Sequence, residues 1–135
     1  MKEINLEIIT PSKQTFNGKV KSVTVPGTAG SFQVLFNHAP LLSTFEIGKV
    51  KIEDLEGKEI EFATSGGTVE VTENKILILA DSLETKEEVD VQRALKSYER
   101  AKERLAARSK DVDTFRVESA LARAINRLKF TNTAF

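Results

Sequence analysis

The amino-acid composition of this chain changes abruptly near residue 84, and this change constrains the fold more than any single motif. All seven glycines and all three prolines of the 135 residues lie in residues 1–84, whereas all seven arginines lie in residues 85–135. The first segment carries 8 Lys against 12 Asp and Glu, a net charge of −4, and the second carries 12 Lys and Arg against 8 acids, a net charge of +4. Such a switch predicts two architectural units, residues 1–84 and residues 85–135.

Residues 1–84 show the period-two alternation of β-strands, which places one face in a core and the other in water. The apolar runs are Ile4–Ile8, Val23–Val25, Phe32–Val34, Val50–Ile52, Ile60–Phe62, Val69–Val71 and the continuous run Ile76–Leu79. Turn residues separate them at Asn17–Gly18, Pro26–Gly27, Glu56–Gly57, Ser65–Gly67 and Glu73–Asn74. Short strands with frequent turns and no intervening helices predict an antiparallel sandwich or barrel.

Residues 85–135 show helical periodicity. Thr85 and Glu88 have the spacing of a capping box, which predicts a helix from about Lys86. Apolar residues then follow a three/four spacing through Leu105, the pattern breaks at Ser109–Asp111, and a second periodic run continues to Leu128. Asp111 or Asp113 is expected to cap the second helix. The sequence therefore predicts an antiparallel two-helix hairpin with a short polar loop.

Most catalytic classes are disfavoured by the residues that the chain lacks. There are no cysteines and only one histidine, His38, so thiol chemistry and multi-histidine metal sites are excluded. The phosphate-binding and zinc-protease motifs are absent, and Ser65–Gly67 is expected to form a hairpin or bulge turn. The charge balance of zero disfavours a nucleic-acid binder. The longest apolar run, Ile76–Ala80, is too short to cross a membrane. Met1–Ile4 shows no apolar signal-peptide region, so we expect no such segment here. We expect a soluble, noncatalytic protein.

The arginines of the predicted hairpin are arranged on helical faces. Arg93 and Arg100 share a face of the first helix, and Arg123 and Arg127 share a face of the second. A fold near residue 110 brings together positions whose numbers sum to about 220, so three or four of these guanidinium groups are expected to converge. Guanidinium groups suit phosphate, which predicts an anion site; the alternative is a solvated face with local ion pairs. Asp90 and Glu84 lie close enough in sequence to supply further hydrogen bonds.

The whole chain resembles the epsilon subunit of bacterial F-type ATP synthases. The resemblance is carried by Leu6–Pro11 near the start, by the loop Asn37–Leu42, by Ser65–Gly67 with Val69–Val71, and by Val89–Ala94. One departure precedes the Asn37 loop, where this chain has Gln33–Phe36 and the family usually has a small residue followed by Leu-Pro. The resemblance implies a β-sandwich followed by a helical hairpin.

In family members that bind ATP in the folded hairpin, the signature is Ile or Leu, Asp, two free positions, Arg and Ala. The resemblance therefore implies that ATP is a regulatory ligand and that no cofactor is required. Its implied contacts in this sequence are Glu84, Val89, Asp90, Arg93, Ala94, Arg100, Arg123 and Arg127. Val89 replaces the larger Ile or Leu of the signature.

The resemblance further implies a noncatalytic rotor subunit of a proton-translocating enzyme, peripheral on the cytoplasmic face of the bacterial cell membrane. Its implied partners are the gamma shaft, the membrane rotor ring and the catalytic alpha/beta head. The implied contacts with the membrane ring are Asn37 and His38. The hairpin would restrain ATP hydrolysis when it extends, and ATP would favour its folded state. Two alternatives remain open. One is a free-standing nucleotide- or anion-sensing adaptor. The other is a nucleic-acid binder that uses the +4 half, which is weakened because Tyr98 lies on the apolar stripe and no stacking platform of phenylalanines interleaves with the arginines.

Overall fold

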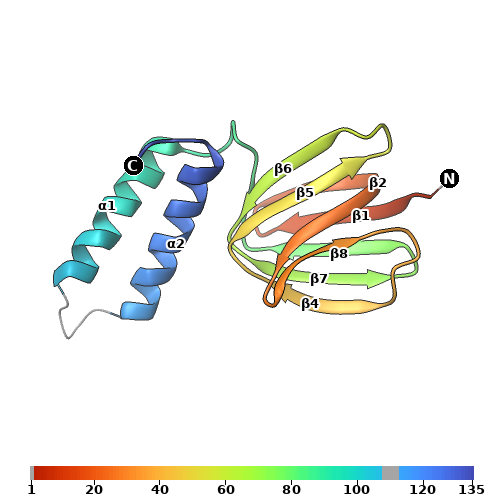
Figure 1. Ribbon diagram of the computed structural model, residues 1–135, viewed down its shortest axis with the longest axis horizontal. Helices are drawn as coiled ribbons and strands as arrows, with labels where there is room; N and C mark the ends of the chain where they lie inside the picture. The colour runs from red at the N-terminus through yellow and green to blue at the C-terminus, as the bar shows by residue number, and fades with distance from the viewer. Residues whose placement is uncertain (1, 108–112) are drawn as a thin grey trace. The chain divides into compact units, whose positions relative to one another are not determined.

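The computed structural model describes residues 2–107 and 113–135, which form a β unit up to Thr85 and a helical unit from Lys86 (Figure 1). The strands of the first unit are β1 (Ile4–Thr10), β2 (Lys13–Gly27), β3 (Gly30–Val34), β4 (Leu41–Phe45), β5 (Gly48–Asp54), β6 (Glu59–Thr64), β7 (Gly67–Thr72), β8 (Lys75–Ala80) and β9 (Leu83–Glu84). The helices of the second unit are α1 (Val91–Ala107) and α2 (Thr114–Phe130).

The β unit is one hydrogen-bonded sheet that folds into two layers, with the strand order β1-β8-β7-β4-β2-β5-β6-β9. Figure 1 shows β5 and β6 in one layer, and β8, β7 and β4 in the other. The 15-residue β2 joins the layers, because its first half pairs with β1 and its second half pairs with β3 and β5. The predicted sandwich followed by a helical hairpin is confirmed.

The core lies between the two layers and is almost entirely aliphatic. Alternate residues of each strand point inward, as the pattern of Ile4, Leu6 and Ile8 in β1 illustrates. Val20 and Val23 of β2 are fully buried, as are Ile52 and Ile78 from β5 and β8. Each fully buried aliphatic side chain contributes about 1.5–3 kcal/mol through removal of apolar surface from water, which accounts for a stable unit without disulfides.

Several local expectations are wrong. Asn17 and Gly18 do not form a turn but lie inside β2, opposite Glu7 and Leu6 of β1. The chain reverses instead at Pro11–Ser12. Pairing with β1 overrides the turn preference of the Asn-Gly pair, because it satisfies the backbone groups on both strands. The sheet also departs from a purely antiparallel arrangement, since β1 and β8 run parallel.

The segment Ser65–Gly67 is not a hairpin, because the strands on either side of it, β6 and β7, pair with other strands. It is a corner between the layers. Gly66 has φ of +110°, a conformation that favours glycine. Gly67 is packed so closely that a Cβ atom there would overlap the carbonyl oxygen of Leu79 and would lie 2.9 Å from the Phe45 ring. The corner therefore requires both glycines.

We predict that Gly67→Ala lowers the free energy of unfolding by about 1–3 kcal/mol or more, because the added methyl group overlaps backbone atoms that cannot move aside. Gly18→Ala is the matched control, since its Cβ would lie at an ordinary 3.5 Å from the Phe16 ring. Urea unfolding followed by far-ultraviolet circular dichroism measures both. Equal stability of the two variants would contradict the close packing at the corner.

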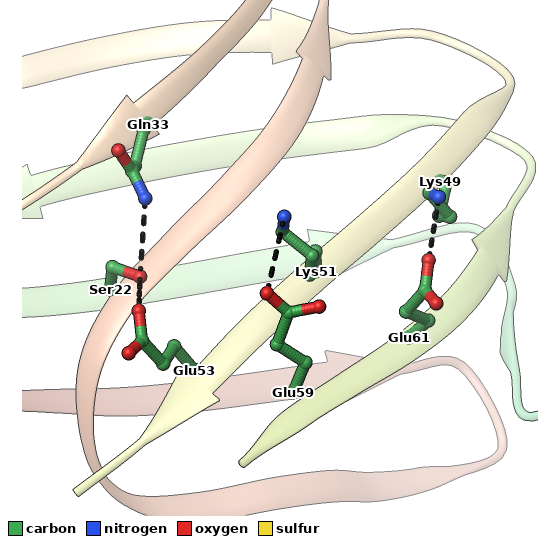
Figure 2. A network of polar contacts seen from close by, with 7 residues as sticks. All are labelled: Ser22, Gln33, Lys49, Lys51, Glu53, Glu59 and Glu61. Carbon is green, nitrogen blue, oxygen red and sulfur yellow. Dashed lines mark hydrogen bonds and ion pairs between the residues drawn. The ribbon is translucent and has the colours of Figure 1, made fainter. Parts of the chain in front are cut away.

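The outer face of β5 and β6 is covered by charged side chains, as Figure 2 shows. Lys49 Nζ lies 2.6 Å from Glu61 Oε2, and Lys51 Nζ lies 3.7 Å from Glu59 Oε1. The pairs are diagonal across the two strands, because Lys51 is directly opposite Glu61 in the register. Exposed pairs of this kind add at most about 1 kcal/mol each. Their main effect is to keep this face of the sandwich solvated.

The two helices of the second unit pack side by side and antiparallel (Figure 1). The buried residues are mostly small or aliphatic, namely Ala94 and Ala101 of α1 and Val117, Ala124 and Leu128 of α2. Small side chains let the helix axes approach closely. Within the ranges that the structure describes, no helix is long and apolar enough to cross a membrane.

The end of α2 is fixed by a Schellman motif. Asn132 has φ of 55°, its N–H donates to the Lys129 carbonyl oxygen at 3.1 Å, and the Thr133 N–H donates to the Leu128 carbonyl oxygen at 2.9 Å. The chain then returns to α1, where the Phe135 ring meets the Tyr98 ring edge-on with centroids 5.0 Å apart. This contact ties the two helices together at one end of the hairpin.

Helix α1 begins later than predicted. Lys86–Glu88 form a turn, and the helix starts at Val91. The Asp90 carboxylate accepts the Arg93 N–H at 3.0 Å, so Asp90 caps the helix. The physical reason is that the chain is still paired with β6 through Leu83–Glu84 and needs the following residues to leave the sheet. Asp113 caps α2 by accepting the Arg116 N–H at 3.2 Å, as expected; Ser109–Asp111 lie outside the described residues.

Candidate functional site

A surface hollow of about 770 Å³ lies between α1 and α2, and the described residues that line it include five arginines. Arg93, Arg100 and Arg104 come from α1, and Arg116 and Arg123 come from α2. Ser97 and Asp113 add polar groups, and Ala101, Val117 and Ala120 form the apolar part of the lining. The hollow is thus a strongly basic groove in the hairpin.

Helix periodicity explains why these side chains share one groove. On α1, Arg93, Arg100 and Arg104 are separated by seven and four residues, so they lie along one face of the helix. On α2, Arg116 and Arg123 are seven residues apart and also share a face. At 1.5 Å per residue, the arginines of α1 extend over about 16 Å. The groove is therefore long enough for several charged groups in a row.

The electrostatics of the groove favour an anion. Guanidinium groups are strongly basic, and among the described residues that line the groove there are five of them and one carboxylate, that of Asp113. Asp113 already accepts the hydrogen bond that caps α2. Within residues 2–107 and 113–135, none of the five arginines forms an ion pair. A phosphate chain would relieve their mutual repulsion and accept bidentate hydrogen bonds from them.

The structure brings together three of the four arginines that the sequence singled out. Arg93, Arg100 and Arg123 line the groove, whereas Arg127 is half-buried and is not among the lining residues. Sequence reasoning missed Arg104 and Arg116. If facing positions in the hairpin have numbers that sum to about 220, then Arg104 faces Arg116 directly. The same rule was therefore sufficient to find these two residues.

The other expected contacts have structural roles of their own. Val89 and Ala94 are buried, at 7% and 4% exposure, so their side chains pack rather than project into solvent. Asp90 is exposed, and its carboxylate caps α1. Glu84 lies in β9, opposite Ala63 of β6, and therefore belongs to the β unit and not to the hairpin.

We predict that Asp90→Ala destabilises the hairpin by about 0.5–2 kcal/mol, because the Arg93 N–H loses its acceptor. Asp90→Asn is the matched control, since the asparagine oxygen caps a helix equally well. The measurement is the loss of helical circular dichroism with temperature in both variants. If Asp90→Asn is as destabilised as Asp90→Ala, charge and not capping explains the role of this residue.

A second candidate site is the loop between β3 and β4, which contains Asn37 and His38. Asn37 is exposed and has φ of 63°, while His38 is half-buried, and its N–H donates to the Leu35 carbonyl oxygen at 3.2 Å. Leu35, the first residue of the loop, and Leu42, in β4, are 53% and 75% exposed. Exposed leucines beside a fixed polar loop are typical of a protein contact.

A third surface is the outer face of β1, β8, β7 and β4. Ile9 lies beside Leu79 in the β1–β8 register, and Leu77 lies two residues along the same face. The row that contains Leu77 continues through Glu70 of β7 to Leu42 of β4. We refer to Ile9, Leu42, Leu77 and Leu79 as the apolar face. The apolar face contrasts with the charged outer face of β5 and β6. Exposed apolar side chains that lie together on a sheet indicate a surface that binds another protein.

Comparison with known proteins identifies matching families for both units. Residues 3–86 match the family model described as the ATP synthase delta/epsilon chain β-sandwich domain, and residues 87–132 match the ATP synthase delta/epsilon chain long α-helix domain. Two curated relatives are the ATP synthase epsilon chains of Moorella thermoacetica and Nitratidesulfovibrio vulgaris. The first is 42% identical over 96% of each chain, and the second is 40% identical over 98% of each chain.

Solved structures share the fold at lower sequence identity. A chain of the Euglena gracilis mitochondrial ATP synthase superimposes with a TM-score of 0.82 and 21% identity, covering 93% of this chain and 79% of that one. A chain of the Tetrahymena thermophila mitochondrial ATP synthase central stalk and ring has a TM-score of 0.68 and 19% identity, with 95% and 96% covered. The resemblance found in the sequence is confirmed.

Proposed function

Because this chain belongs to the ATP synthase delta/epsilon family and is a noncatalytic subunit of ATP synthase, we propose that it acts as a rotor element with a ligand-controlled hairpin. The β unit would bind the gamma shaft and the membrane ring, and the hairpin would regulate ATP hydrolysis by the alpha/beta head. The observation that carries the proposal is the groove of five arginines in a hairpin joined to a separate β unit.

The β unit offers two surfaces for the rotor contacts. The apolar face suits a long helix of the gamma shaft, because aliphatic side chains on a flat sheet bury area against any regular apolar stripe. The loop of Asn37 and His38 suits the polar loops of a membrane ring. Such contacts would place the subunit at the cytoplasmic surface of the membrane, in a complex that couples proton flow to ATP synthesis.

The groove is proposed to hold the phosphates of ATP, with Arg93, Arg100 and Arg123 as hydrogen-bond donors. Arg104 and Arg116 add positive charge to the same groove. Hydrolysis is not expected there, because guanidinium groups do not accept a proton from water and Asp113 is occupied by capping. The described residues also contain no group of three His, Asp or Glu side chains that could hold a metal ion.

Binding would control the hairpin through differential affinity. Five guanidinium groups repel one another when the helices are folded together, so the folded state is costly without an anion. A ligand that binds only this state stabilises it by about 2.7 kcal/mol at 100 times its dissociation constant. An extended hairpin would separate the arginines and expose the faces that α1 and α2 bury in each other, leaving them free for the shaft and the head.

The second candidate function is a free-standing sensor that uses the same groove outside any rotary complex. The apolar face favours the rotor subunit, because a free sensor needs no exposed leucines on the β unit. Co-purification distinguishes the two. Recovery of the chain with the membrane-bound ATPase supports the rotor function, and recovery only as a free monomer supports the sensor.

We predict that the full chain binds ATP and that Arg93→Ala or Arg123→Ala weakens binding by about 1.5–3 kcal/mol, or ~10–150-fold, through loss of a charged hydrogen bond. Isothermal calorimetry with ATP measures the affinity. Lys96→Ala is the matched control, because it removes one positive charge from α1 outside the groove. Arg127→Ala tests whether the site extends beyond the groove. Absence of binding heat at millimolar ATP would refute the site.

We also predict that ATP closes the hairpin. The chain has no cysteine, so single cysteines at the exposed positions Glu99 and Glu118 can carry a fluorescence-transfer pair across α1 and α2. Transfer efficiency should rise on addition of ATP and should rise less in the Arg123→Ala variant. Equal efficiency with and without saturating ATP would show that the hairpin is static, leaving only the rotor contacts of the β unit.

A further inference from the structure

Three residues other than glycine adopt left-handed backbone conformations on two neighbouring loops of the β unit. Asn37 has φ of 63° in the β3–β4 loop, and Glu73 and Asn74 have φ of 47° and 60° in the two-residue turn between β7 and β8. This region is disfavoured for L-residues, and glycine would occupy it without strain. Asparagine tolerates this region better than most residues, because its short polar side chain can form hydrogen bonds close by, so the partners of the Asn37 and Asn74 side chains matter here.

The asparagine side chains join the two loops by reciprocal hydrogen bonds. The Asn37 N–H donates to Asn74 Oδ1 at 2.7 Å, and Asn74 Nδ2 donates to Asn37 Oδ1 at 3.2 Å. The Asn74 carbonyl oxygen also accepts the Asn5 N–H at 2.9 Å, which ties the turn to the start of β1. We call the Asn37–Asn74 pair the asparagine clasp. It connects residues 37 positions apart in the sequence.

The clasp fixes the same loop that carries His38. Within the loop, the His38 N–H donates to the Leu35 carbonyl oxygen at 3.2 Å, and His38 Nδ1 lies 2.7 Å from the Ala39 carbonyl oxygen. These bonds are local and do not anchor the loop to the rest of the β unit. The clasp supplies that anchor, because Asn74 belongs to a turn between two paired strands.

We propose that Asn74 is a positioning residue for the contact between the β unit and the membrane ring. The proposal rests on the ring contact through Asn37 and His38 given under the proposed function. By holding the loop in one conformation before binding, the clasp removes the ordering cost that a free loop would carry into the complex. The expected consequence is tighter binding to the ring, with little contribution to the stability of the isolated chain.

The decisive variant is Asn74→Gly, because glycine keeps the left-handed turn, relieves its strain and removes the clasp. Glu73→Gly is the matched control, since it relieves strain in the same turn and leaves the clasp intact. Binding of the full chain to the detergent-solubilised membrane ring is measured by biolayer interferometry. We expect Asn74→Gly to weaken binding roughly two- to tenfold. Glu73→Gly should bind like the unmodified chain.

Two further readouts separate positioning from a structural role. Asn74→Asp keeps the acceptor for the Asn37 N–H and loses the donor, so it should recover most of the affinity. Hydrogen exchange of the Asn37 amide should accelerate in Asn74→Gly and not in Glu73→Gly. The melting temperature of Asn74→Gly should be unchanged or higher, because the lost bonds are exposed and the strain is relieved.

The outcomes also separate this proposal from the ring contact on which it rests. His38→Ala tests the contact itself. If His38→Ala weakens ring binding and Asn74→Gly does not, the positioning role of Asn74 is overturned and the contact stands. If neither variant changes ring binding, the contact is overturned and the positioning role with it. If the hydrogen-exchange rate of the Asn37 amide is unchanged in Asn74→Gly, the clasp is overturned directly, independently of the result for ring binding.

Discussion

Strand β2 is the element on which the β unit depends, because it forms backbone hydrogen bonds with four other strands. Its 15 residues are too long for one flat layer, and the register shifts between Ile8 and Ile9 of β1 and between Val20 and Ser22 of β2 let it turn from one layer into the other. Closure of the sheet in this way leaves few unpaired strand edges. This course of β2 through both layers also determines the positions of the β3–β4 loop and the β7–β8 turn, which the asparagine clasp connects.

The hairpin depends on a different balance of forces. Three of the five buried residues of α1 and α2 are alanines, so the helices lie close together but these positions bury little apolar area. The five arginines of the groove oppose the folded state, while the two caps and the Tyr98–Phe135 contact support it. A helix N-cap contributes about 0.5–2 kcal/mol and an aromatic pair about 0.5–1.5 kcal/mol, so the supporting contacts are modest in size. We propose that a ligand bound in the groove shifts this balance toward the folded state.

Sequence periodicity predicted the fold class because most strands bury alternate residues. β4 was missed since Leu41 and Leu42 are adjacent leucines, and Leu42 is exposed and breaks the alternation. β9 has only two residues and therefore no period. Two predictions failed for one reason: the turn predicted at Asn17–Gly18, and the helix start predicted near Lys86, which is earlier than the observed start at Val91. In both places a strand pairing that is distant in sequence outweighs a local preference, and a single sequence does not record that pairing.

The candidate site was predictable to the extent that it follows from helix geometry. Spacing along each helix and a fold near residue 110 placed Arg93, Arg100 and Arg123 in one groove, and the same geometry accounts for Arg104 and Arg116. The asparagine clasp does not follow from any period, because it depends on two left-handed residues whose loops meet only in three dimensions. Most of the regular elements of this chain are thus predictable from periodicity in its sequence. The loops that would engage partners are defined by contacts that only the folded sheet creates.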